Sequence, residues 1–316
     1  MTMARRRVSS QHVIHRAAER IRAGVDDLII VGGVESMSQV PTSSSTLVHC
    51  RFGASEAGSA PANVGRGIVA ELVAARWKLG RQQLDDYAAR SRQRAEEVAA
   101  VGEFQPEIAP VTVWTSSSRS VVYADETVQS RGATENLATF PPLFHDREIE
   151  SRFPEIGWHI TEGNSSRWAD GASAMIIASE RRAAELGLQP WARFVALAES
   201  DDDLTTELCG PIRATRTVLK QSGIQVDDLD HYEISEAFAS IPLAWQYEFA
   251  ADSDRLNPRG GAIALGHPIG ASGVRSMATM LNALEATGGR LGLQAMEGAG
   301  STANVAIIEK LSPGHR

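Results

Sequence analysis

The segment that most limits what this chain can fold into is residues 257–275, which read NPRGGAIALGHPIGASGVR. Its glycines allow backbone to approach backbone or a ligand closely, at an entropic cost inside an ordinary helix or strand. His267 lies between Gly266 and Pro268, so this turn is suited to hold one imidazole at a fixed place. Two interpretations are open from the spacing alone: a tight structural loop with an incidental histidine, or a loop that presents His267 for chemistry.

The composition narrows the class of protein. With 316 residues, 43% of them hydrophobic and 22% charged, the chain is long enough for two or three domain-sized cores. A net charge of −8 argues against nucleic acid as a partner, since phosphate binding needs a basic face. No apolar run approaches the roughly 18 residues of a membrane helix, so we expect no membrane association. The two cysteines, Cys50 and Cys209, are expected to be packing residues in a cytoplasmic protein, and no metal site is predicted.

Helical and extended patterns alternate along the chain, which predicts a layered α/β fold. Phe238 is expected on a helix, and Ser272 is expected to cap the helix that follows the glycine-rich segment. Residues 41–67 and the polar stretch up to about residue 130 are expected to be loops, and residues 131–144 to be short-helical. The predicted helices are residues 9–24, 68–77, 81–100, 180–186, 211–222 and one ending at 286; the predicted strands are residues 28–31, 111–114, 171–179, 192–199, 231–234 and 303–309.

Five sequence blocks, in this order, resemble the thiolase family, whose members make or cleave 3-ketoacyl-CoA. They are GGVESMS (32–38), DDYAARSRQRAEE (85–97), TEGNSSRWADGASA (161–174), EISEAFAS (233–240) and the GHP segment (257–275). The similarity extends from about residue 9 to residue 311. Residues 1–24 have two interpretations: an arginine-rich mitochondrial transit peptide, or the family's helix of the type SSQQAIH, which lies inside the fold. We favour the helix.

The resemblance implies a thiolase-like layered α/β fold of two similar halves, packed sheet to sheet around a shared helix layer. Residues 1–38 and 168–190 are then the remnant of an incomplete N-terminal half, because family members carry several strands and helices before the SSQQAIH helix. Residues 39–167 correspond to the loop domain that receives CoA, and residues 191–316 to the C-terminal half. An incomplete half would expose an unpaired sheet edge. We therefore expect low stability, or a homo-oligomer or hetero-oligomer with a thiolase subunit.

The resemblance also assigns the catalytic positions. The family uses a nucleophilic cysteine at the start of a buried helix, and here that position is Arg7, which can neither attack nor carry an acyl group. The histidine of the GHP turn is His267. The asparagine that holds an oxyanion water is Ser235. Glu297 either replaces the family's second cysteine, which moves the Cα proton, or is the neighbour of a deleted cysteine.

The positions that bind CoA in the family match the family's residues more often than the catalytic positions do. Ser166 matches the serine that contacts the pantetheine arm, and Ala237 and Phe238 match residues that line the same tunnel. An alternative for Phe238 is simple core packing. Gln129 occupies the position of an arginine that faces the CoA phosphates, which predicts weaker CoA affinity. No cofactor is expected beyond a coenzyme A thioester as substrate or ligand.

Three functional hypotheses follow. The first is a thiolase-type acyl-CoA acyltransferase of fatty-acid or sterol side-chain degradation, inactive or impaired because its nucleophile is absent. The second is a non-catalytic protein that binds acyl-CoA or pairs with an intact thiolase subunit. The third is the product of a damaged gene.

Overall fold

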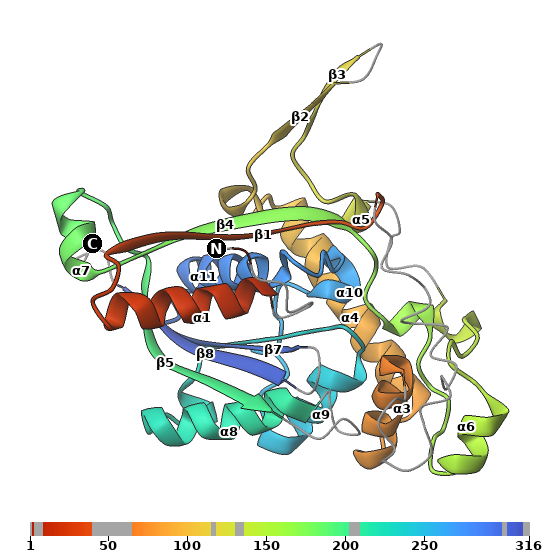
Figure 1. Cartoon of the computed structure of the whole chain (residues 1–316). Coiled ribbons are helices and arrows are strands. Elements are labelled where there is room, and N and C mark those ends of the chain that lie inside the picture. The colour runs from red at the N-terminus through yellow and green to blue at the C-terminus, as the bar shows by residue number, and fades with distance from the viewer. Residues whose placement is uncertain are drawn as a thin grey trace.

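Two helices lie side by side between two sheets and form the middle layer of this computed structural model (Figure 1). They are α1 (Ser9–Arg22) and α11 (Ser272–Thr287). One sheet pairs β1 (Leu28–Ser36) with β4 (Asp170–Ala178), and the other has the order β5-β8-β7-β6. The residues that the structure describes are Thr2 and 9–39, 65–114, 118–129, 136–201, 209–298 and 302–311.

The middle layer is fixed by apolar side chains that point to both sheets. Helix α1 contributes residues at helical spacing, and α11 contributes a longer apolar stripe. Because one cluster includes side chains from α1, α11, β1, β4 and β8, removing either helix would expose both sheets. The buried members of this cluster are Ile14, Ala17, Val31, Ile177, Val274, Met277, Met280, Leu281, Leu284, Ala306 and Ile308.

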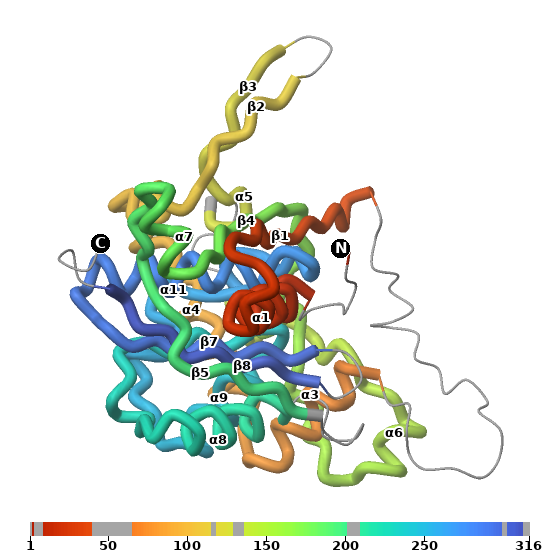
Figure 2. The backbone as a smooth tube through the Cα atoms, turned by 60° about the vertical axis from the view of Figure 1, so that its left-hand side comes forward, coloured from red at the N-terminus to blue at the C-terminus, as the bar shows by residue number. Residues whose placement is uncertain are grey.

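The larger sheet has further helices on its outer face, so that its strands are covered on both sides. Strands β5, β8 and β7 run side by side, and α8 and α9 lie below them (Figures 1 and 2). The single parallel pair is β6 with β7, and the other pairs are antiparallel. The elements are α8 (Gly210–Ser222), α9 (Ser240–Phe249), β5 (Ala192–Asp201), β6 (His231–Ile234), β7 (Leu291–Glu297) and β8 (Thr302–Lys310).

The segment between β1 and β4 supplies helices that lie over one end of the larger sheet. Helix α3 packs against α9, and α4 packs against α5 and α10. Their bounds are α3 (Arg66–Arg76), α4 (Arg81–Ala100), α5 (Glu126–Gln129), α6 (Arg147–Arg152) and α10 (Ala262–Leu265), and α7 (Glu180–Glu185) follows β4.

The predicted strand 28–31 is longer in the structure. It continues through Gly32 and Gly33 to Ser36, beyond the predicted end at residue 31, because every residue from Leu28 to Ser36 pairs with β4. A Cβ on Gly33 would lie 2.0 Å from the carbonyl oxygen of Gly270, so glycine is needed where β1 passes the GHP segment. Long-range pairing and this close approach override the local turn signal.

The outer face of the β1–β4 sheet is apolar and open. Ile30 is 70% exposed and Val34 73% exposed, and Ile176 of β4 lies on the same face. Among the described strands, β1 pairs with β4 alone. The expectation of an unpaired edge with an apolar face therefore has a structural counterpart here.

Other local predictions need correction. Part of the expected polar loop before residue 130 is strand β3 (Arg119–Val122), which pairs with β2 (Val111–Trp114) in a hairpin that projects from the body (Figure 2). Arg119 lies over the ring of Trp114, 5.1 Å from its centroid. Phe238 precedes α9 and forms an isolated bridge with Ser165 instead of lying on the helix.

In the described part of the chain, no helix is both long enough and apolar enough to cross a membrane. Most of the expected loop 41–67, residues 131–135 of the short-helical piece, Arg7 and Cys50 lie outside the described residues.

His15 should make the stability depend on pH. Burial lowers the pKa of His15 to about 4, although the carboxylate of Glu199 opposes this shift. Because the unfolded chain then binds a proton that the folded chain refuses, stability should fall as pH drops from about 6.5 to about 4. In His15→Gln, the loss of unfolding free energy between about pH 6.5 and pH 4 should be smaller by up to about 3 kcal/mol, measured by urea unfolding at several pH values. The exposed His145, changed to Gln, is the matched control, and an equal flattening in both variants would contradict the assignment.

Candidate active site

The N-termini of α1 and α11 meet at one point. The hydroxyl oxygen of Ser10 accepts hydrogen bonds from the backbone N–H of Gly273 (2.8 Å) and of Val274 (3.3 Å). This contact is possible because residue 273 is glycine: a Cβ there would lie 2.2 Å from the backbone nitrogen of Gln11. Helix N-termini carry partial positive charge. The meeting point therefore favours an anionic group.

His267 is held beside this point by its own loop. It is 3% exposed, and its backbone N–H donates to the carbonyl oxygen of Arg167 (2.8 Å). Ser272 Oγ donates to the carbonyl oxygen of Pro268 (2.8 Å) and lies 2.9 Å from His267 Nδ1. A hydroxyl has one proton, so this arrangement favours Nδ1–H as the donor and Nε2 as the acceptor nitrogen.

Ser272 therefore has a different role from the one predicted. The N-cap position of α11 is Ala271, and the side chain of Ser272 orients His267 instead of capping the helix. The turn before the histidine needs glycine, because Gly266 has φ +81° and a Cβ there would lie 2.7 Å from the Cβ of Ala169.

The smaller sheet holds the GHP segment from the other side. The backbone N–H of Gly270 donates to the carboxylate of Glu35 on β1 (2.8 Å). Ser173 on β4 donates through its hydroxyl to the carbonyl oxygen of Ala271 (2.7 Å). Glu35 belongs to the GGVESMS block, and Ser173 to the block that ends in DGASA, so three of the five family blocks meet here.

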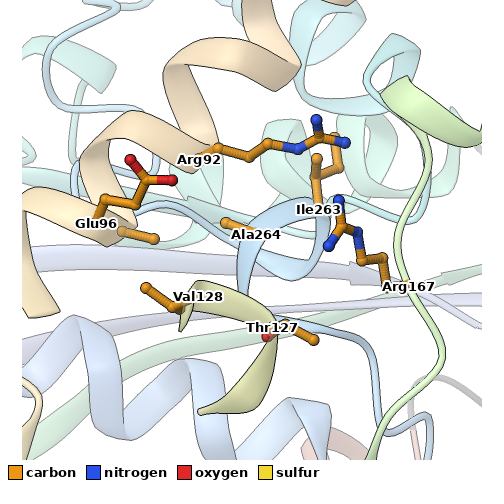
Figure 3. A pocket seen from close by; sticks show the side chains of 8 residues that line it. Arg92, Glu96, Thr127, Val128, Arg167, Ile263 and Ala264 are labelled. Atoms are coloured by element: carbon orange, nitrogen blue, oxygen red, sulfur yellow. The ribbon is translucent and has the colours of Figure 1, made fainter. Parts of the chain in front are cut away.

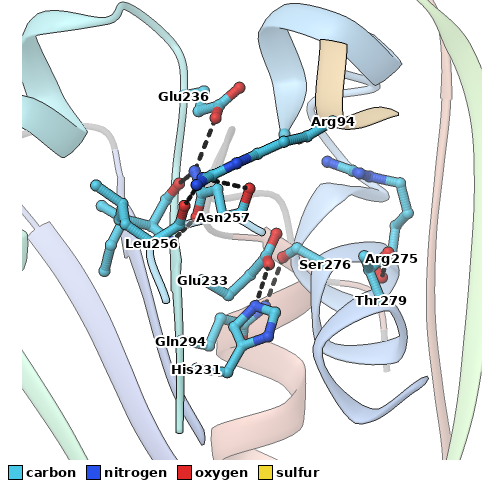
Figure 4. A network of polar contacts seen from close by, with 12 residues as sticks. Arg94, His231, Glu233, Glu236, Leu256, Asn257, Arg275, Ser276, Thr279 and Gln294 are labelled. Carbon is cyan, nitrogen blue, oxygen red and sulfur yellow. Dashed lines mark hydrogen bonds and ion pairs between the residues drawn. The ribbon is translucent and has the colours of Figure 1, made fainter. Parts of the chain in front are cut away.

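A buried polar hub fixes the beginning of the same segment (Figure 4). Asn257 accepts from the backbone N–H of Ile234 (2.8 Å) and donates to Glu236 (2.8 Å). Glu236 also accepts from the hydroxyls of Tyr87 and Ser91, both at 2.8 Å, and from the backbone N–H of Ile263 (3.1 Å). Burial raises the pKa of Glu236, and its hydrogen bonds oppose part of that rise. The hub ties α4 to the C-terminal half of the chain.

Ser235 and Glu297 lie at the same end of neighbouring strands. The backbone N–H of Ser235 donates to the carbonyl oxygen of Ala295 (3.0 Å), and its buried hydroxyl has no partner within the described residues. Glu297 ends β7 and is fully buried. Its nearest counter-charge is Arg66, the first residue of α3, with Nη2 3.8 Å from Oε1.

The three predicted CoA-contacting residues lie together, but two of them are core residues. The backbone N–H of Ser166 donates to the carbonyl oxygen of Ala237 (3.0 Å). Ala237 and Phe238 are buried, and the ring of Phe238 packs edge-to-face on Phe144 with centroids 6.1 Å apart. The core interpretation of Phe238 thus has direct contacts to support it, and a ligand would have to approach Ser166.

A narrow cleft lies next to the GHP segment, between α4, α5 and α10 (Figure 3). Arg92 and Arg167 extend into it from different elements, and Thr127 and Val128 of α5 line the opposite wall. Arg167 also supplies the carbonyl oxygen that holds His267, so the cleft adjoins the histidine. Gln129, at the end of α5, is next to this wall in sequence.

The remaining predicted positions lie elsewhere or outside the described residues. Cys209 is buried in the core at the N-cap of α8, against the outer face of the larger sheet. Arg7 and Cys50 are not among the described residues. Over the described ranges, no group of three or more His, Cys, Asp or Glu side chains is placed to hold a metal ion.

Sequence reasoning missed the hub of Glu236 and Asn257 and the contact between Arg66 and Glu297. An acid inside the apolar run EAFA and an arginine that begins an otherwise apolar helix were the available signals. Each signals a buried charge that needs a partner. Neither signal names that partner, because each partner is far away in sequence.

Two domain models of one enzyme family match the chain. The thiolase N-terminal domain matches residues 1–181 and the thiolase C-terminal domain matches residues 188–310. The chain belongs to the thiolase family, and its layered α/β fold is the thiolase-like fold. The division into residues 1–38 with 168–190, 39–167 and 191–316 stays a prediction.

Individual relatives agree with this assignment. The chain is 39% identical to the steroid 3-ketoacyl-CoA thiolase FadA6 of Mycobacterium tuberculosis, over 98% of this chain and 75% of that protein. It is 37% identical to a 3-ketoacyl-CoA thiolase of Marinobacter nauticus, over 91% and 72% of the two chains. The crystal structure of human mitochondrial 3-ketoacyl-CoA thiolase superposes with a TM-score of 0.85 at 30% identity, covering 98% of this chain and 78% of that one.

Replacing Glu236 by Gln should destabilise the fold by about 2–3 kcal/mol. One carboxylate oxygen accepts from Asn257 and Tyr87, and the other accepts from Ser91 and Ile263. In either orientation of the new amide, its NH₂ group would face the side-chain N–H of Asn257 or the backbone N–H of Ile263, and neither of these donors can rotate away. A buried donor would therefore lose its acceptor. Urea unfolding measures this loss.

Glu285→Gln is the matched control for this substitution. Glu285 is half exposed and pairs with Lys310 on the surface, so its loss should change stability by less than about 0.5 kcal/mol. A Glu236→Gln variant as stable as the control would contradict the role of the hub.

Proposed function

We propose that this thiolase-family chain binds a coenzyme A thioester at the His267 site, with acyl transfer absent or impaired for lack of a nucleophilic cysteine. The observation that carries the proposal is the placement of His267, buried and oriented by Ser272 where the N-termini of α1 and α11 meet. An imidazole and two helix N-termini suit the polarisation of a thioester carbonyl, typically the largest contribution to such chemistry.

The arginines beside the GHP segment carry positive charge that suits the phosphates of CoA. Arg167 is half-buried, and the buried Arg92 donates to the carbonyl oxygen of Gly163 (2.8 Å), in a chain whose overall charge is −8. Guanidinium groups bind phosphate oxygens through charge-assisted, often paired hydrogen bonds. We place the phosphates of the ligand outside this cleft, beside Arg167, and its thioester at His267. With Gln129 at the position of a family arginine, affinity should be weaker than in other family members.

The number and position of the cysteines support the absence of acyl transfer. The sequence contains only Cys50 and Cys209. Cys209 is buried in the core on the outer side of the larger sheet, away from the layer that contains α1 and α11. By resemblance, the nucleophile position is Arg7, whose guanidinium cannot form an acyl intermediate. The relatives named 3-ketoacyl-CoA thiolase suggest a 3-ketoacyl-CoA as the ligand.

Calorimetric titration with acetoacetyl-CoA tests the proposal. The wild-type chain should bind it, and Arg167→Ala should weaken binding by about 10-fold or more, the worth of a charge-assisted contact. Arg181→Ala, on the surface of α7, is the matched control and should bind as the wild type does. No binding by the wild-type chain would refute the proposal.

The mass of the intact chain after the same incubation tests the absence of acyl transfer. We expect no covalent adduct. An acyl group that maps to Cys50 or Cys209 would make the chain a working acyltransferase with a relocated nucleophile.

A second candidate function is that of a subunit that pairs with a second copy or with another thiolase subunit. The exposed apolar face of Ile30, Val34 and Ile176 favours it, together with the free edge of β1 among the described strands. Light scattering of the purified chain should show a dimer or larger assembly, and Val34→Lys should shift it toward monomer. A monodisperse monomer of the wild-type chain would count against this candidate.

A further inference from the structure

The base of the β2–β3 hairpin is seated on both sides of the turn that carries His267. One leg enters β2 from the short helix η2 (Gln105–Glu107), and the other continues from β3 into α5. Ile108 and Val128, one from each leg, pack on the apolar cluster that contains Leu265 at the end of α10. Helix η2 packs on α11, so the base contacts the helices before and after the turn.

A hydrogen-bond chain joins the first leg to α11. Oε1 of Glu107 lies 3.2 Å from Oγ1 of Thr279, which also lies 3.2 Å from the carbonyl oxygen of Arg275. Arg275 and Thr279 are one turn apart on α11 (Figure 4). A hydroxyl has one proton, so Thr279 cannot donate to both oxygens at once. If Glu107 is protonated, it donates to Thr279 while Thr279 donates to the carbonyl, and the chain is complete.

Burial favours the protonated form of Glu107. It raises the pKa of Glu107 to about 7, although the positive charges of Arg275 and Arg259 oppose this shift. The like charge of Glu233 on β6, whose carboxylate lies 2.9 Å from Nε2 of His231, adds to the rise. Within the described residues, Oε2 of Glu107 and the Nε and Nη1 atoms of Arg275 are buried without a hydrogen-bond partner. The ionised carboxylate would therefore be poorly solvated.

Other acids share the two cations. Arg259 donates to the carboxylate of Glu103 (2.7 Å). The charge of Arg275 also acts on Asp125, an exposed residue between β3 and α5 on the second leg. Neither guanidinium is therefore reserved for Glu107, and the protonation of this acid decides how firmly the first leg holds to α11.

We propose that the base of the hairpin is a pH-sensitive latch on the turn that carries His267, closed while Glu107 is protonated and loosened when Glu107 ionises. Opening of the base admits water to the carboxyl group, which then ionises at its ordinary pKa of 4.5. The closed base holds its proton up to about pH 7, so opening becomes easier as pH rises from about 4.5 to about 7 and changes little above. This latch needs no ligand and goes beyond the proposed binding of acyl-CoA.

Hydrogen exchange of single backbone N–H groups, followed by NMR at pH 5, 6 and 7, tests the latch. Each rate is divided by the intrinsic rate at that pH, which gives a protection factor. The N–H of Ile108, which donates to Gln105 (3.3 Å), reports on the base, and the N–H of His267, which donates to Arg167 (2.8 Å), reports on the turn. In the wild-type chain, both protection factors should fall by about 10-fold or more between pH 5 and pH 7.

Glu107→Gln is the decisive variant. Its amide keeps a donor for Thr279 and cannot ionise, so both protection factors should stay within about twofold over the same pH range. Glu126→Gln, at an exposed position that begins α5 on the other leg, is the matched control and should lose protection as the wild type does.

Several results would overturn the latch. One is a wild-type chain whose protection does not fall with pH, or a Glu107→Gln variant in which it falls as steeply as in the wild type. Another is a fall at Ile108 with no change at His267, which would mean that the base does not hold the turn. A third is equal protection at pH 7 of Ile108 and of Leu293, a buried residue of β7, which would mean that the base opens only when the whole chain unfolds.

Acetoacetyl-CoA extends the test to the proposed site, and this step rests on the proposed function. Helix α5 supplies Thr127 and Val128 to the wall opposite Arg167, so we expect the ligand to bind the closed form. At 100 times its Kd, a ligand that binds only the closed form should raise the protection of Ile108 by about 100-fold. Calorimetric binding without added protection would overturn the link between latch and site. Absence of binding would refute the proposed function and leave the pH test of the latch valid.

Discussion

The close contact between the N-termini of α1 and α11 is the constraint on which the rest of the structure depends. A single glycine, Gly273, lets the two backbones approach until Ser10 reaches the first N–H groups of α11. Both helices also contribute to one apolar cluster with both sheets, so the contact fixes the whole middle layer. The partial positive ends of two helices are thereby brought to one point, beside the turn that carries His267.

A second constraint is polar. Glu236 and Asn257 place a carboxyl group and an amide in the interior, where a polar group without hydrogen bonds would be costly. Their hydrogen bonds reach Tyr87 and Ser91 on α4, so the helix over the site is held to the same segment that presents His267. Apolar packing sets the layers of this fold, whereas this polar hub sets the alignment of the site across them.

The sequence predicted the parts of the structure that depend on local patterns. The main helices, most strands and the GHP turn were found from periodicity, glycine and family resemblance. Prediction failed where distant residues decide: Gly32 to Ser36 continue a strand because β4 pairs with them, and Ser272 turns to His267 instead of capping its own helix. The contact of Arg66 with Glu297 was equally invisible, since nothing local links α3 to the end of β7.

The proposed function separates ligand binding from acyl transfer, which a complete thiolase site combines. An acyl intermediate needs a nucleophile, and by resemblance an arginine stands at that position and supplies none. Polarisation of a thioester carbonyl needs hydrogen-bond donors and positive potential, and His267 beside the N-termini of α1 and α11 supplies both. Loss of the nucleophile therefore removes transfer of the acyl group without removing the means to hold and polarise its thioester.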